Sequence, residues 1–204
     1  MTQRQTSEGL PQAGGLRERK RRETLERIAQ VGLKMFVENG YDETTLQAVA
    51  QAANISARTF FYYFRTKEDI LQHFQGAGFL QALGPAIRAV SPEQPPVDAV
   101  RDCLVSLASR YETEQSVAID RLLRSTEALR VRKQATFAQM EATVFESLCE
   151  VWPRKTQRGS LRVVAMLSIG IMRLAMDSWR EGGGRRVLAE HVREGFARLK
   201  ADCA

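Results

Sequence analysis

Apolar residues recur at helical spacing along most of the chain, and two short stripes stand close together between residues 44 and 69. The first has the i, i+3, i+4, i+7 spacing that marks one face of a short helix, and it consists of Leu46, Val49, Ala50 and Ala53. The second consists of Phe60 and Phe64, which stand at i and i+4 within the predicted helix Ala57–Phe64. The pattern predicts two short helices, each with one buried face.

Residues that begin and end helices stand at the borders of these two segments. Thr45 and Ser56 are suited to cap the first and second helix, because a hydroxyl accepts a hydrogen bond from a free N–H of the first turn. Asn54 tolerates the left-handed conformation that ends a helix, and Ile55 supplies an apolar plug in the turn. With small alanines at the crossing, the two helices are predicted to form a helix-turn-helix, whose second helix enters the major groove of DNA.

A longer amphipathic helix precedes this pair. It is expected to begin near Arg17 and to end at Asn39-Gly40, and its apolar stripe consists of Leu25, Ile28, Ala29, Gly32 and Phe36. Its first residues are basic: Arg17, Arg19, Lys20, Arg21 and Arg22. A run of charge is usually a solvated face, but ahead of a helix-turn-helix it predicts contacts with phosphates or the minor groove.

A fourth helix follows the pair, capped by Thr66 with Asp69 at the third position. Lys67 lies at its N-terminus, where free N–H groups favour an anion such as a phosphate. We expect this helix to continue through Phe79, and a further short helix could form around Pro85–Val90.

The rest of the chain also has helical periodicity. After the linker Ser91–Pro96, five helices are expected at Val97–Glu112, Val117–Leu129, Ala135–Val151, Ser160–Arg180 and Arg186–Asp202. The sequence predicts an all-α protein of about nine helices. Its expected parts are a disordered tail at residues 1–15, a head at 16–65 and a body at 66–204.

Net charge, cysteine spacing and the length of apolar runs limit the classes of function, but they do not identify one. A net charge of +6 permits a polyanionic partner, and three widely spaced cysteines without a CxxC pair indicate a reducing compartment. The longest apolar run, Val163–Met172, is too short to span a membrane. These features favour a cytoplasmic protein.

The run TTLQAVAQAANISARTFFYYFRTKEDIL resembles the N-terminal DNA-binding domain of TetR-family transcriptional regulators. The shared features are a Thr-rich entry, an Ala-containing second helix, Ile-Ser, a Thr, aromatics that end in Tyr-x-Phe and a Lys-Glu pair opening the fourth helix. The resemblance extends roughly from Arg17 to Phe74. It departs at Phe61, where the family usually has a tyrosine whose hydroxyl contacts phosphate. The resemblance implies a three-helix DNA-binding head joined to a ligand-binding and dimerisation body.

The head residues expected to meet DNA lie on its outer face. They include Ala57, Arg58, Thr59, Tyr62 and Tyr63 on the second helix of the motif, with Gln47 near the start of the first. Arg58 is in the turn nearest the bases, and its guanidinium can hold O6 and N7 of guanine. The resemblance implies phosphate contacts for Thr45, Thr59, Tyr63 and Lys67. Gln47 is suited to a base edge or a phosphate, and Tyr62 lies between the two roles.

The last expected helix carries a regular apolar stripe of Leu188, Val192, Phe196 and Leu199. A monomer could use this stripe as core. The resemblance implies instead that the last two long helices form a dimer interface, and a symmetric dimer also suits a head whose single short helix reads few base pairs. We therefore expect a second subunit to cover the stripe.

Methionines and aromatics gather in the body and allow two interpretations. Adaptable side chains could line a pocket for an apolar effector, and the candidates are Phe137, Met140, Phe145, Met166 and Met172. An ordinary core would need the same residues. A basic segment nearby is suited to an anionic effector or to a solvated face, and its cations are Arg121, Arg124, Arg130, Arg132 and Lys133.

These observations predict a homodimeric repressor that binds double-stranded DNA at a palindromic operator and is released by a small, largely apolar effector. The alternative is a constitutive or architectural DNA-binding dimer. An enzyme is disfavoured, because His73 and His191 each have one carboxylate a turn away but no third ligand and no nucleophile or phosphate-loop motif is present. No metal or cofactor is expected.

Overall fold

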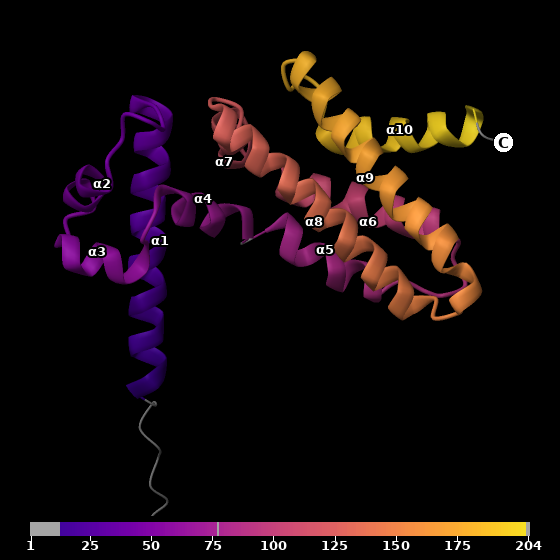
Figure 1. The fold of residues 1–204 in the computed structure, drawn as a ribbon, viewed down its shortest axis with the longest axis horizontal. Coiled ribbons are helices and arrows are strands. Elements are labelled where there is room, and N and C mark those ends of the chain that lie inside the picture. The colour runs from indigo at the N-terminus through magenta and orange to yellow at the C-terminus, as the bar shows by residue number, and fades with distance from the viewer. Residues whose placement is uncertain (1–12, 77, 203–204) are drawn as a thin grey trace, which may run out of the picture. The chain divides into compact units, whose positions relative to one another are not determined.

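A computed structural model of the chain describes residues 13–76 and 78–202. The regular structure in these two stretches is entirely helical, with ten α-helices and a single 3-10 turn (Figure 1). The chain divides into two compact units, a head up to Leu71 and a body from Gln72 onward. The predicted all-α class is confirmed, with one more helix than the nine expected.

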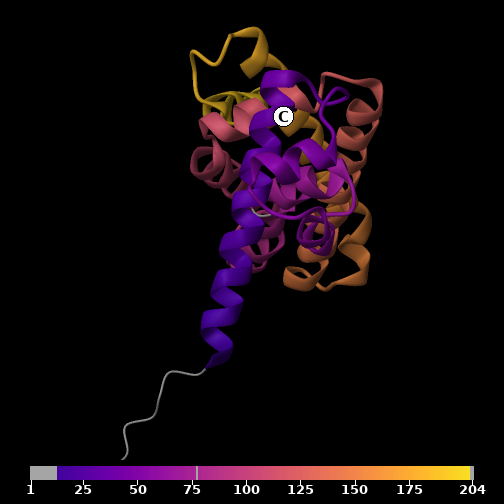
Figure 2. The same ribbon diagram turned by 90° about the vertical axis from the view of Figure 1, so that its left-hand side faces the viewer.

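The head is built on a long helix, α1 (Ala13–Asn39). Helix α2 (Leu46–Ala52) packs against α1, and α3 (Ala57–Tyr63) packs against α2. The N-terminal turns of α1 extend beyond the α2–α3 pair (Figures 1 and 2). The buried side chains are those of the predicted stripes together with the start of α4 (Lys67–Gly76), and they include Ile28, Phe36, Val49, Phe60, Phe64, Ile70 and Leu71.

Helix α1 begins earlier than expected. Residues 13–15, which we assigned to a disordered tail, are helical, while residues 1–12 of that expected tail lie outside the described residues. The early start is consistent with the good helix formers that follow. It is also consistent with ion pairs at helical spacing, Arg19 with Glu23 and Arg21 with Glu18.

Close approach between α1 and α4 depends on one glycine. A Cβ atom at Gly32 would lie 2.9 Å from Cδ1 of Ile70, which is too close for an unshifted neighbour. Ile70 is fully buried. The absence of a side chain at Gly32 therefore lets α4 begin directly against α1.

The body contains six α-helices and the 3-10 turn. They are α5 (Phe79–Arg88), α6 (Pro96–Tyr111), α7 (Glu114–Leu122), α8 (Glu127–Val151), η1 (Lys155–Gln157), α9 (Arg158–Glu181) and α10 (Leu188–Asp202). The long helices α8 and α9 run antiparallel, α5 packs on α8, and α10 crosses α9 and α6 (Figure 1). Their buried faces form one apolar core.

Several helix boundaries in this region differ from the sequence prediction. The helix expected at Val117–Leu129 ends at Leu122, and α8 begins at Glu127 rather than at Ala135. Helix α4 ends at Gly76 and α5 begins at Phe79, whereas a single helix through Phe79 was expected. Two glycines in that stretch weaken a continuous helix, and the interruption gives the additional helix. The break expected at Gln115-Ser116 is also wrong, because Ser116 is the third residue of α7 and forms a capping box with Thr113.

The two tryptophans of the chain tie loops and helix ends together in the body. Trp152 donates its indole N–H to the carbonyl of Pro92 at 2.9 Å, so the Pro-rich linker is held against the end of α8. Trp179 donates to one carboxylate oxygen of Glu112 at 2.7 Å. The other oxygen of Glu112 accepts the backbone N–H of Leu188 at 2.8 Å, and this fixes the start of α10.

One segment of the described chain, Lys155–Glu181, is long and apolar enough to cross a membrane by length and composition. Of its most apolar window, 39% is buried inside the protein. A helix of a soluble core passes the same test, so this finding is weak support for a membrane span. Of the other apolar residues of the segment, Val164 and Met176 pack against the core and Val163, Met166, Leu167 and Leu174 are exposed.

Candidate functional site

The turn between α2 and α3 has the geometry that the sequence predicted. Thr45 accepts a hydrogen bond from the N–H of Ala48 at 3.1 Å, and Ser56 accepts one from Thr59 at 3.1 Å. Asn54 adopts a left-handed conformation with a φ of 53°, and the N–H of Ile55 donates to the carbonyl of Ala50 at 3.1 Å. This local network fixes the angle between α2 and α3.

The outer face of α3 is exposed and forms an open hollow of about 560 Å³. The hollow is lined by Arg58, Thr59, Phe61, Tyr62 and Tyr63. The side chain of Tyr62 is 70% exposed and that of Phe61 45%, values that are high for aromatic residues of a small globular unit. An exposed aromatic surface with a cation beside it is suited to contact another molecule.

Arg58 is available for such a contact. Among the described residues, no hydrogen bond or ion pair engages its side chain, and Arg58 is exposed in the first turn of α3. Arg58 thus makes no ion pair with a carboxylate of the described residues. Gln47 is likewise exposed, in the first turn of α2, and Ala57 is exposed beside Arg58.

The basic residues of α1 lie on the same unit and are all exposed: Arg17, Arg19, Lys20, Arg21 and Arg22. The guanidinium of Arg21 lies 6.0 Å from the centre of the Tyr62 ring, which brings the start of α1 beside the outer face of α3. The ion pairs of Arg19 and Arg21 are exposed on both sides and contribute little to stability. These cations remain free to meet phosphates.

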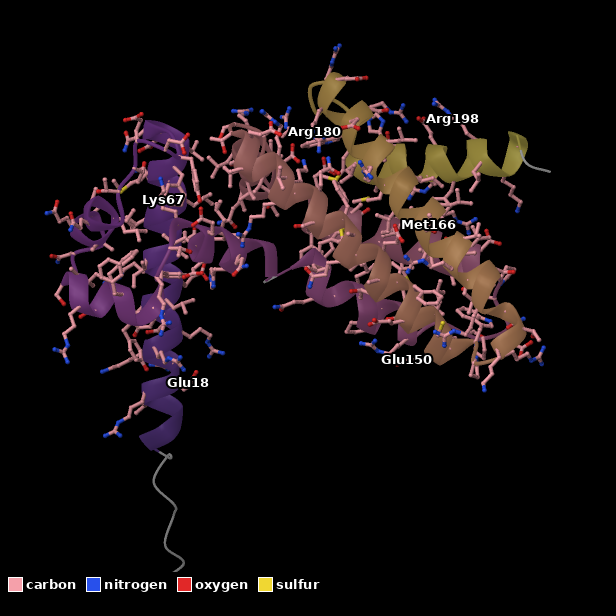
Figure 3. The ribbon with its side chains drawn as sticks, in the orientation of Figure 1. Glu18, Lys67, Glu150, Met166, Arg180 and Arg198 are labelled. Carbon is pink, nitrogen blue, oxygen red and sulfur yellow. The ribbon has the colours of Figure 1, made fainter. Side chains whose placement is uncertain are left out.

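Lys67 differs from the role predicted for it. Its ammonium donates hydrogen bonds to the carbonyls of Tyr41 and Asp42 at 2.7 and 3.2 Å, and it lies 4.6 Å from the centre of the Tyr41 ring. Its charge is thus directed at the loop between α1 and α2 (Figure 3). In this structure Lys67 holds the head together, and at most one of its three donors is left for a phosphate.

Comparison with known proteins supports this view of the head. Residues 28–74 match the family model described as bacterial regulatory proteins, tetR family. The HTH-type transcriptional regulator TcmR of Streptomyces glaucescens is 35% identical over 65 residues, which cover 32% of this chain and 29% of TcmR. Residues 28–74 thus match the TetR family. The matched segment spans less than a third of TcmR, so the likeness concerns only a part of that protein.

Solved structures extend the likeness to the body. The repressor FadR of Thermus thermophilus, in complex with lauroyl-CoA, is 25% identical, with a TM-score of 0.55 over 86% of this chain and 92% of FadR. SmeT in complex with triclosan is 17% identical, with a TM-score of 0.67 over 88% of this chain and 91% of SmeT. The SmeT likeness establishes a shared fold of head and body.

The side chains predicted to line an effector pocket do not all come together. Phe137, Met140 and Met172 belong to the body core, and Phe145 packs at its edge under the guanidinium groups of Arg158 and Arg162. Met166 is 52% exposed and lies on the outer side of α9 (Figure 3). In this structure the first three side chains serve as core, the simpler of the two interpretations.

The predicted dimer stripe on α10 faces its own subunit, and this part of the prediction is corrected. Val192 and Phe196 are buried in the core formed with α6 and α9, and Leu188 and Leu199 pack against that core. Four large apolar side chains that stay exposed are on the preceding helix, α9. They are Val163, Met166, Leu167 and Leu174.

The sequence contained a sign of this second face. Helix α9 is apolar on nearly all sides, which indicates burial on more than one side. Val163, Leu167 and Leu174 follow one another at i, i+4 and i+11, the spacing of one helix face. The periodicity therefore identified apolar faces on both helices but not which one is covered within the subunit.

A polar cavity in the body was not assembled from the sequence. It has a volume of about 170 Å³ and lies between the N-terminal half of α8 and the C-terminal half of α9, near the end of α7. It is lined by Arg124, Arg130, Lys133, Gln134, Phe137, Arg173, Asp177 and Arg180. Three of these cations come from the basic segment for which a solvated face was the alternative.

Proposed function

We propose that this protein is a homodimeric transcriptional regulator, a repressor that binds a palindromic operator in double-stranded DNA. The observation that carries the proposal is the outer face of α3, where the unpaired Arg58 lies among exposed aromatics beside the basic start of α1. Arg58 and Gln47 are suited to base edges, and Thr45, Thr59, Tyr63 and the α1 cations are suited to phosphates. A protein with this role acts in the cytoplasm.

The dimer that we propose uses the outer face of α9. Its four exposed apolar residues share one side of the helix, and covering them excludes water from apolar surface. A two-fold interface brings the same patch of both subunits together. Two heads related by this symmetry would read half-sites about one turn of DNA apart, roughly 34–36 Å, or a multiple of that distance.

The body is proposed to bind the effector that releases the repressor from DNA. FadR of Thermus thermophilus holds lauroyl-CoA and SmeT holds triclosan, and both have this fold. An effector that binds the DNA-free conformation more tightly would shift the population away from the operator. The constitutive alternative differs in one respect, because no small molecule would then weaken DNA binding.

Operator selection tests the proposal directly. The purified full chain is incubated with a pool of random duplex DNA, and bound sequences are enriched and read over several rounds. We expect an inverted repeat with a fixed spacing between half-sites. If no sequence were enriched, or only single half-sites without a second copy, the result would contradict DNA binding by a symmetric dimer.

A further inference from the structure

The small cavity between α8 and α9 contains more cations than its carboxylates can neutralise. Five basic side chains line it, and they are Arg124, Arg130, Lys133, Arg173 and Arg180. The carboxylates that pair with these cations are the buried Asp120, Glu127 and Asp177, of which Asp177 lines the cavity. Five positive charges therefore stand against three negative ones.

The carboxylates are already engaged. Asp120 binds Lys133 and Arg180 and lies 3.3 Å from Nε of Arg124. Asp177 pairs with Arg180, and Glu127 pairs with Arg130. Arg173 has no carboxylate partner among the described residues, and its guanidinium stacks on the ring of Phe137 at 5.3 Å.

The excess of positive charge also contributes to a lowered pKa of Lys133. Burial lowers the pKa of Lys133, its hydrogen bond to Asp120 raises it, and the nearby Arg180 and Arg124 lower it further. The net shift is downward even though Lys133 has a carboxylate partner. The surroundings of Lys133 would thus be stabilised by an added negative charge.

The wall of the cavity changes character at Phe137. Arg130, Lys133, Gln134 and Phe137 follow at i, i+3, i+4 and i+7 on one face of α8. Phe137 also belongs to the apolar core that contains Met140 and Met172. A ligand in the cavity would therefore meet cations at one end and an aromatic ring at the other.

We propose that this cavity binds the oxyanion head of an organic anion, a carboxylate or a phosphate ester whose apolar part lies against Phe137. The inference rests on the proposed function, because it names the chemical class of the effector. Arg173 provides the charge that no carboxylate of the described residues neutralises, and Gln134 adds an amide donor. A volume of about 170 Å³ accommodates a head group but is below the 300–1,000 Å³ typical of a whole ligand.

Arg173 is the position at which to test this site. Removing Lys133 or Arg180 would leave Asp120 buried with fewer partners and would destabilise the body. Arg173→Gln removes one charge without breaking an ion pair. The matched control is Arg154→Gln, because Arg154 is exposed, makes no ion pair with a described residue and follows the C-terminal end of α8, away from the cavity.

Titration calorimetry of the full chain without DNA gives the measurement, with octanoate, octyl phosphate and octanol as probes. We expect both anions to bind the wild type and the Arg154→Gln variant at least tenfold more tightly than octanol does. Arg173→Gln should lose about ten- to a hundredfold in affinity for both anions, the cost of one charge-assisted hydrogen bond. The anion that binds more tightly identifies the head group as a carboxylate or a phosphate.

Three results would overturn the proposal: neither anion binds, octanol binds equally well, or Arg173→Gln and Arg154→Gln behave alike. Equal thermal unfolding of the two unliganded variants excludes a general loss of fold. Operator DNA is then added in a separate experiment. Anions that bind but leave the DNA complex intact would contradict release by an effector and would leave the anion site standing.

Discussion

Arg180 on α9 donates two hydrogen bonds to the buried carboxylate of Asp120 on α7, one to each oxygen, at 2.8 and 3.0 Å. Lys133 on α8 binds the same carboxylate. One acidic side chain therefore joins three helices, and its bidentate geometry with Arg180 is the strong form of such a pair. The three helices meet beside the basic cavity, so Asp120 also determines where its cations lie.

Replacement of Asp120 by Ala should be strongly destabilising. The change removes the buried carboxylate from the largely buried Lys133 and Arg180, and breaking a buried pair in this way costs about 3–5 kcal/mol. Urea denaturation followed by circular dichroism measures the free energy of unfolding. Asp177→Ala is the control, because Asp177 also pairs with Arg180 but is 62% exposed, and a loss as large as that of Asp120→Ala would contradict the role of burial.

The contribution of Asp120 should depend on pH. Burial alone would raise the pKa of Asp120, but hydrogen bonds from Arg180 and Lys133 outweigh it and hold the pKa below its usual value. A lowered pKa means that the stabilisation is complete above the unfolded value of about 3.9 and is lost as the pH falls through the folded value. The stability gap between the wild type and Asp120→Asn should therefore be constant near neutral pH and narrow below about pH 4. If the stability difference between the wild type and Asp120→Asn grew in acid, the pKa of Asp120 would not be lowered in the folded protein.

Arg58→Ala should relax base selectivity. Loss of a guanidinium that holds guanine costs about 1–3 kcal/mol per half-site and removes the preference at one operator position. Operator selection with the variant, compared with the wild type, measures both effects. An unchanged base preference would remove Arg58 from the reading residues and leave Gln47 and Tyr62.

Lys67→Ala distinguishes a phosphate contact from a structural one. The hydrogen bonds to Tyr41 and Asp42 predict that the variant loses about 1–3 kcal/mol of head stability. A contact with phosphate alone would leave stability unchanged and reduce the salt dependence of DNA binding by about one unit per half-site. Thermal unfolding and DNA titrations at several salt concentrations separate the two results.

Leu174→Glu should weaken self-association without unfolding the subunit. Leu174 is 69% exposed, so glutamate is tolerated in the monomer, but an interface on α9 would bury that charge without a partner. We expect sedimentation to show at least about a tenfold weaker dimer. Val131→Glu, at an exposed apolar position on α8, is the matched control. Phe196→Glu should instead unfold the body, because Phe196 is part of its core.

Features set by a few neighbouring residues could be predicted from the sequence. The caps at Thr45 and Ser56 and the left-handed Asn54 depend on local hydrogen bonds and backbone sterics, and all three are confirmed. The partner of an apolar face is not local information. Periodicity showed that Phe196 lies on an apolar stripe, but only the crossing of α10 over α6 and α9 shows that the same subunit covers it.

The cavity between α8 and α9 could not be predicted from the sequence for the same reason. Its walls come from residues about forty positions apart in the chain, such as Lys133 and Arg173, which antiparallel packing of α8 and α9 brings together. Lys67 presents a different case. The sequence correctly predicted that Lys67 lies at the start of α4. Its side chain, however, donates to carbonyl groups of a loop that precedes it by more than twenty residues.

Both tryptophans of the chain lie in the body, each held by a hydrogen bond from its indole nitrogen, and the head has none. Tryptophan emission is thus a natural label for one of the two units. Melting followed by fluorescence reports the body alone, whereas the far-ultraviolet dichroism of the helices reports the sum of both. The difference between the two curves gives the stability of the DNA-reading unit in the intact chain, with no dye attached and no truncation required.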